Sequence, residues 1–70
     1  MIWSVVPQWK AGGYVIRQYA TDHDPPHVHV YRDRKLIAKV VIPDGTFMFL
    51  ASKSHRGRIL AALRQCELID

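Results

Sequence analysis

The sequence lacks the features that mark secreted and membrane-embedded proteins. Cys66 is its one cysteine, so no internal disulfide can form and a disulfide-stapled secreted scaffold is excluded. The longest apolar runs, 47–51 and 59–63, fall far short of the roughly 20 residues that cross a bilayer. Residues 1–7 have neither the basic start nor the long apolar segment of a signal peptide. We therefore expect a cytoplasmic protein without membrane contact, in which Cys66 packs as a buried apolar thiol.

Acidic residues are also scarce. The 70 residues include ten Lys and Arg against six Asp and Glu, which gives a formal net charge of +4. This balance favours anionic partners, which include nucleic acid, phosphate ligands and a small acidic protein; a solubilising surface charge explains the same excess. The length allows a single domain, 1–70. A domain of this length has a small core and therefore a marginal stability, which association commonly remedies. We therefore expect a protein partner or a homo-oligomer.

Short alternating segments separated by turn signals predict an antiparallel sheet. Strands are expected at 2–6, 14–20, 28–32, 36–42 and 46–51. Turns are expected at 11–13, at 32–35 and at Asp44-Gly45, the last as a type I′ hairpin. A helix follows, with apolar residues at helical spacing: Ile59, Leu60, Leu63 and Cys66. The predicted fold is α+β, an antiparallel β-meander of about four to five strands packed against one C-terminal helix.

Residues 23–29, HDPPHVH, form the most informative segment of the sequence. On a strand, His27, His29 and Tyr31 share one face while the intervening valines take the other. Two imidazoles roughly 7 Å apart at Cβ can bind one metal ion or act as general acid and base on one substrate, and His23 can supply a third ring. The alternative is the polar face of an amphipathic strand whose valines fill the core.

Three histidines are the number of protein ligands that catalytic zinc commonly takes. The candidates for a divalent metal such as zinc are His23, His27 and His29, assisted by Asp22 or Asp24. Histidine also titrates near neutral pH, so acid–base work by the same three residues needs no cofactor. From the residues alone, a metal site, a nucleic-acid or phosphate contact, and a plain polar strand face all stay open.

A second group of candidates crowds the start of the predicted helix. These cations and hydroxyls could contact phosphate: Lys53, Ser54, His55, Arg56 and Arg58. Helix dipoles favour anions at this end, by roughly 0.3–1 kcal/mol per well-placed charge, so a bound phosphate would resolve the conflict; screening by solvent is the alternative. The predicted hairpin tip adds three cations, Arg32, Arg34 and Lys35. If both groups share a face, they form a nucleic-acid footprint.

Aromatic residues divide by their expected environment. Those expected in the core are Trp3, Trp9, Phe47 and Phe49, and those expected at the surface are Tyr14, Tyr19 and Tyr31. Stacking of nucleic-acid bases on the tyrosines would need a groove, which the sequence does not reveal.

A run of motifs in the first half of the chain resembles a known family. The residues Gly13-Tyr14-Val15-Ile16, then Tyr19, then HDPPHVHV at 23–30 resemble the small bacterial domain-of-unknown-function family 4160. The resemblance implies a compact α+β fold. It also implies one half of a two-gene unit with another small domain, in the manner of toxin–antitoxin pairs. The three histidines match the family as motif positions only.

Composition and resemblance together lead to one functional expectation and two alternatives. We expect a small basic toxin–antitoxin-type component that binds or acts on nucleic acid and is held by a protein partner. RNA is favoured as the nucleic acid, and DNA stays open. If it is an enzyme, it is ribonuclease-like, with acid–base candidates His27, His29 and His23. The alternatives are a histidine-based metal-binding module and a non-catalytic protein-interaction domain.

Overall fold

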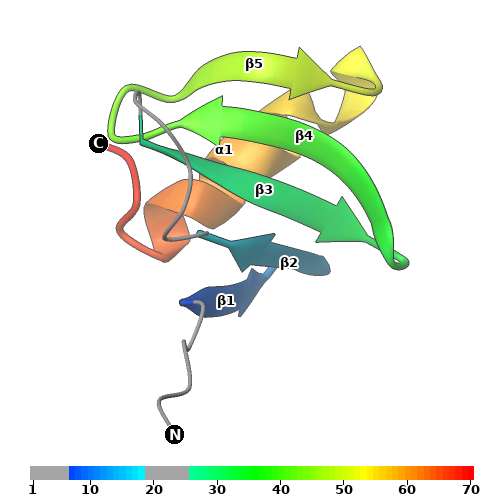
Figure 1. Cartoon of the computed structure of the whole chain (residues 1–70), viewed down its shortest axis with the longest axis horizontal. Helices are drawn as coiled ribbons and strands as arrows, with labels where there is room; N and C mark the ends of the chain where they lie inside the picture. The colour runs from blue at the N-terminus through cyan, green and yellow to red at the C-terminus, as the bar shows by residue number, and fades with distance from the viewer. Residues whose placement is uncertain (1–6, 19–25) are drawn as a thin grey trace, which may run out of the picture.

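The computed structural model describes residues 7–18 and 26–70. Its elements run in the order β1 Gln8–Ala11, β2 Tyr14–Arg17, β3 His27–Arg32, β4 Lys35–Val41, β5 Thr46–Leu50, η1 Lys53–His55 and α1 Arg56–Gln65. The five strands form one antiparallel sheet in sequence order, and the 3₁₀ turn η1 leads into α1, which crosses one face of that sheet (Figure 1). The predicted meander with one C-terminal helix is confirmed. Neither η1 nor α1 has the length and apolarity needed to span a bilayer.

The first described strand, β1, was not predicted. It occupies Gln8–Ala11, whereas the strand expected at 2–6 lies outside the described residues. Trp9 pairs with Ile16 of β2 and packs against the core. Gly12 and Gly13 then turn the chain with φ of 59° and 83°, a backbone that glycine adopts at no steric cost. The predicted turn is therefore confirmed. The alternation of apolar and polar residues did not reveal β1, because Trp9 is the one large apolar residue of this strand.

The core lies between α1 and the face of the sheet that α1 covers. Its fully buried members alternate along the strands and recur on one side of α1: Tyr14, Ile16, Val28, Val30, Ala38, Val40, Ile59 and Leu63. The helical spacing predicted for Ile59 and Leu63 is therefore confirmed. Leu60 and Cys66 are half-buried and pack at the edge of this core. Desolvation by burial raises the pKa of the Cys66 thiol, as apolar surroundings do for any thiol.

The hairpin turn predicted at Asp44-Gly45 is wrong in type. A type I′ turn needs positive φ at both central residues, and between 42 and 45 only Gly45 has one, of 83°. The residue before such a two-residue turn must also donate its N–H to close the hairpin, and Pro43 has none. The chain instead makes a longer connection, in which the Gly45 N–H donates to the carbonyl of Val41 at 2.8 Å.

The β3–β4 turn has the geometry that was expected at the other hairpin. Asp33 and Arg34 have φ of 52° and 67°, so both central residues are left-handed. Neither is glycine, and a left-handed backbone costs an ordinary residue roughly 1–2 kcal/mol. Asp tolerates this conformation better than most residues because its short side chain can hydrogen-bond locally, whereas Arg34 has no such compensation.

Two predictions about aromatic residues are wrong. Tyr14 is 1% exposed, because β2 turns it under the helix, where its hydroxyl and His55 Nδ1 form a hydrogen bond of 3.0 Å. Phe49 is 43% exposed, because the register pairs it with Lys39 on the face that α1 does not cover. Of the rest, Trp9 and Phe47 pack against the core as predicted, Tyr31 is half-buried, and Trp3 and Tyr19 lie outside the described residues.

Removing the Tyr14 hydroxyl tests this link between β2 and the helix start. We expect Tyr14→Phe to lower the free energy of unfolding by about 1 kcal/mol, because one hydrogen bond is lost while the ring stays. His55→Ala should cost at least as much, because it leaves the Tyr14 hydroxyl buried without this partner. Urea unfolding followed by circular dichroism measures both. An unchanged midpoint in Tyr14→Phe would contradict the contact.

Candidate functional site

The strands present a second set of side chains on the face opposite α1, which we call the open face. Alternation and register place on it residues from all five strands: Gln8, Lys10, Val15, Arg17, His27, His29, Tyr31, Lys39, Val41 and Phe49. Figure 1 views the sheet from this side, with α1 behind β3 and β4. The two valines of β3 point the other way and are fully buried. The predicted division of β3 into a histidine face and a valine face is therefore confirmed.

A single row of side chains crosses the open face from β1 to β5. The register pairs Gln8 with Arg17, Arg17 with His29, His29 with Lys39, and Lys39 with Phe49. Directly opposite residues of this kind lie about 5 Å apart at Cβ. This cross-strand row therefore sets His29 between two cations and ends in the exposed ring of Phe49.

Three rings follow one another along β3 on the same face, and we call them the β3 ring ladder: His27, His29 and Tyr31. The ring centres of His27 and His29 are 5.1 Å apart, with the rings inclined at 50°. Those of His29 and Tyr31 are 6.5 Å apart, with the rings nearly parallel at 22°. Arg17 Cζ lies 5.4 Å from the centre of the Tyr31 ring, within cation–π range. All three rings are half-buried, so the ladder combines accessible ring surface with a fixed position.

The open face is positively charged. Within 7–18 and 26–70, the acidic residues stand in turns or after α1: Asp33, Asp44, Glu67 and Asp70. None of the described strands contains a carboxylate, whereas Lys10, Arg17 and Lys39 project from three of them. A face on which the described strands place cations and no carboxylate attracts polyanions, and the attraction weakens as salt is added.

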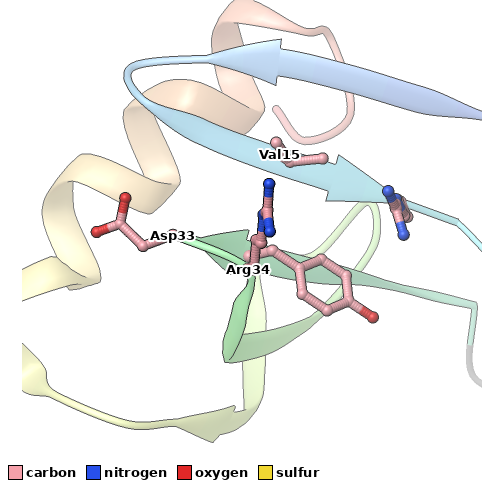
Figure 2. A pocket seen from close by; sticks show the side chains of 5 residues that line it. Val15, Asp33 and Arg34 are labelled. Atoms are coloured by element: carbon pink, nitrogen blue, oxygen red, sulfur yellow. The ribbon is translucent and has the colours of Figure 1, made fainter.

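A pocket opens where the β3 ring ladder meets the β3–β4 turn. It has a volume of ≈ 360 Å³ and is lined by Val15, Arg17, Tyr31, Asp33 and Arg34. In Figure 2 the Arg34 side chain extends toward Val15, while the carboxylate of Asp33 points away from both. Two guanidinium groups and one phenol ring therefore dominate the polar lining.

The candidates at the helix start lie on the covered side of the sheet. Ser52 precedes η1, and its Oγ accepts from the Ser54 N–H at 3.4 Å. Neither η1 nor α1 has an acidic residue in its first turn, so the predicted excess of cations at this end is present. Contact of Lys53, Ser54, Arg56 and Arg58 with phosphate stays a prediction.

The three cations predicted to act together at the hairpin tip separate. Arg32 Cζ lies 5.5 Å from the centre of the Tyr14 ring, on the covered side where His55 also contacts Tyr14. Arg34 lines the pocket on the open side, and Lys35 is exposed at the start of β4. Of these three cations, Arg32 therefore lies on the side of the helix start, whereas Arg34 does not. The helix start and the β3 histidines do not meet in a cleft either, because α1 packs on the valine side of β3.

The metal-site alternative depends on residues outside the described part of the chain. His27 and His29 are neighbours, but His23, Asp22 and Asp24 fall within 19–25. Among residues 7–18 and 26–70, no three His, Cys, Asp or Glu side chains gather in an arrangement that could hold a metal ion. Zinc binding by the three histidines stays a prediction.

Sequence reasoning missed Arg17 and Lys39, the two cations beside His29. Lys39 is the one charged residue within an otherwise apolar stretch, 36–42, and that exception was the available signal. Assigning it to the row required the register, since β4 pairs with both β3 and β5. Arg17 carried no signal of its own, because its face depends on where β2 begins.

Comparison with known proteins identifies the family of this chain. The family model described as a domain of unknown function (DUF4160) matches residues 13–67, which span the sheet from β2 onward and the whole of α1. No curated protein and no solved structure matches the chain. The matched region includes the glycine–tyrosine strand and the histidine–proline segment that carried the resemblance. The chain belongs to the DUF4160 family.

Proposed function

We propose that this protein binds single-stranded RNA across the open face of its sheet. The observation that carries the proposal is the cross-strand row, in which Arg17 and Lys39 flank His29 and the exposed Phe49 ring ends the row. Cations that track phosphates and rings that stack on bases are the two elements of single-strand recognition. Sheets that display aromatic side chains bind RNA in this manner.

The dimensions of the open face suit an extended strand. Arg17 and Lys39 are two strands apart, or about 10 Å at the usual spacing of the strands. Between them the β3 ring ladder runs at right angles to the row and offers three rings to bases. Because no described strand carries a carboxylate, nothing on these strands repels the phosphates.

The same geometry supports the ribonuclease-like activity expected from the sequence, which we keep as part of the proposal. Ring centres 5.1 Å apart bring His27 and His29 within reach of one phosphodiester. Imidazole can accept a proton from the ribose 2′-hydroxyl and return one to the leaving oxygen near neutral pH. One ring would accept the proton of the 2′-hydroxyl as its oxygen bonds to phosphorus, and the other would protonate the 5′-oxygen as its bond to phosphorus breaks, which are the acid–base roles expected of His27 and His29.

The partner expected from composition and resemblance also has a suitable surface. β5 is an edge strand with no charged residue, and its Met48 and Phe49 are 51% and 43% exposed. Such an edge can pair with a strand of another chain. We propose that the acidic protein partner of a toxin–antitoxin-type pair, or a second copy, contacts β5. Binding there would also cover one end of the cross-strand row.

Replacing Phe49 tests the proposed function. Base stacking contributes roughly 1–3 kcal/mol per base, so Phe49→Ala is expected to weaken binding of a fluorescent single-stranded RNA about 5- to 150-fold. Fluorescence anisotropy between about 50 and 200 mM salt measures the affinity, and a gel of the same samples reports cleavage. Met48→Ala, a neighbouring exposed position on β5, is the matched control and should bind like the original protein.

Two outcomes would contradict the proposed function. One is the absence of RNA binding by the unmodified protein at the lowest salt concentration. The other is an equal loss in the two variants, which would make β5 as a whole, rather than the Phe49 ring, responsible for the effect.

A further inference from the structure

The pocket at the end of the β3 ring ladder combines features of a built anion site. Arg17 is held from two directions: its Nε donates to Gln8 Oε1 at 2.9 Å, and its Cζ lies 5.4 Å from the Tyr31 ring centre. A guanidinium restrained in this way loses little further freedom when a ligand binds. Its terminal nitrogens still carry four N–H donors, so Gln8 acts as a positioning residue for Arg17.

The backbone beneath the second guanidinium is strained. Arg34 has a φ of 67°, at a position where two-residue hairpins favour glycine. Strain of this kind persists where the surrounding structure or the function requires it. The left-handed backbone of Arg34 places its guanidinium at the pocket, opposite Val15 (Figure 2). Glycine would fit this backbone but has no side chain to place there. The sequence therefore has arginine at position 34 despite the backbone strain, and the arginine side chain lines the pocket.

The charge of the pocket fits a phosphate with two negative charges. Arg17 and Arg34 provide two positive charges, while the Asp33 carboxylate points away from Arg34. A phosphate monoester carries about −1.5 to −2 at pH 7, and an internal phosphodiester carries a single charge. The volume of ≈ 360 Å³ lies within the roughly 300–1,000 Å³ of small-molecule sites, enough for a phosphate together with part of its nucleoside.

We propose that this pocket binds the terminal phosphate monoester of an RNA strand whose bases stack on the β3 ring ladder. The proposal rests on the proposed function, and it specifies that the site recognises a phosphorylated end of the RNA strand. The ladder leads from His27 through His29 to Tyr31, and Tyr31 itself lines the pocket. The strand would therefore pass from Phe49 and Lys39 to His29, turn along the ladder and end at the β3–β4 turn, with its last phosphate between Arg17 and Arg34.

The test compares three short RNAs of one sequence that differ only at their ends: a 5′-phosphate, a 3′-phosphate, or hydroxyls at both ends. We expect one of the two phosphorylated strands to bind about 10-fold more tightly than the dihydroxyl strand, as a typical pair of charge-assisted hydrogen bonds provides. The preference should shrink as pH falls through the second phosphate pKa of about 6, because the monoester then loses one charge. Which end is preferred identifies the polarity of the bound strand.

Two glycine substitutions distinguish the effect of losing the Arg34 side chain from the effect of relieving a strained backbone. Arg34→Gly should abolish the preference for a terminal phosphate while binding of the dihydroxyl strand falls less than about threefold. Glu67→Gly relieves the same kind of backbone, with φ of 60° after α1, and should keep the preference. Both should raise the melting temperature, because glycine removes a left-handed cost of roughly 1 kcal/mol.

The possible failures are distinct. Equal affinity for all three RNAs would overturn the terminal-phosphate site and leave RNA binding by the open face standing. Binding of none of them would overturn both. A preference that survives Arg34→Gly would show that the phosphate is recognised elsewhere on the molecule and would overturn the assignment to this pocket.

Discussion

The double variant Arg17→Ala/Lys39→Ala is expected to bind single-stranded RNA about 10- to 100-fold more weakly than the unmodified protein at about 50 mM salt. Each phosphate contact on a single strand contributes about 0.7 to the slope of log affinity against log salt concentration. Losing two should therefore reduce that slope by about 1.4. Anisotropy titrations over a series of salt concentrations give both quantities.

The helix start supplies a matched control for this result. Lys53→Ala/Arg58→Ala removes the same charge from exposed residues on the covered side of the sheet. If the open face binds RNA, this control should change the affinity less than about threefold, through the net charge alone. A loss as large as that of the Arg17 and Lys39 variant would move the binding site to the helix start, as the cluster of cations there first suggested.

Leu63→Ala is expected to have the largest effect on stability. Leu63 is 0% exposed beneath the sheet, and leucine-to-alanine changes in cores cost about 2–5 kcal/mol. Folded domains have roughly 0.05–0.15 kcal/mol per residue, so the total for a chain of this length is on the order of 4–10 kcal/mol. The variant should therefore lose about half of its stability, measured by urea unfolding.

A second leucine shows whether burial between α1 and the sheet accounts for the loss of stability in Leu63→Ala. Leu36 is half-buried, pairs with Tyr31 and does not belong to the core cluster. Leu36→Ala makes the same chemical change and should cost clearly less, since the cavity term applies to fully enclosed sites. Equal losses in the two variants would contradict the placement of α1 over the valine face.

The alternation of valine and histidine was sufficient to predict both the main strand and its two faces. Val28 and Val30 alternate with His27 and His29, and a period of two has only one structural meaning. The same pattern also contained the separation of the β3 histidines from the helix start. Because the valines face the core and α1 must cover them, the histidines had to lie on the side away from the helix start.

Other parts of the site could not be predicted, because they depend on register. Arg17 and Lys39 flank His29 only through the pairing of β2 and β4 with β3. The β3–β4 pairing shifts between Val30 and Tyr31, and the β4–β5 pairing shifts between Lys39 and Val40. A one-residue slip moves every side chain to the opposite face. The pocket could not be predicted either, because Arg34 lines it on a left-handed turn whose geometry the sequence favoured at Asp44-Gly45 instead. His23 lies outside the described residues.

The cross-strand row takes one residue from each of the five strands, and in this meander each strand pairs only with its neighbours in sequence. A bound RNA that contacts Arg17, the β3 ring ladder, Lys39 and Phe49 would therefore bridge the boundaries between strands from β2 to β5, so separating these strands would weaken its binding. By mass action, a ligand at a hundred times its dissociation constant adds about 2.7 kcal/mol to the free energy of unfolding. For a core of this size that is a substantial share of the total free energy of unfolding. Bound RNA would therefore stabilise the sheet much as an additional packed element would.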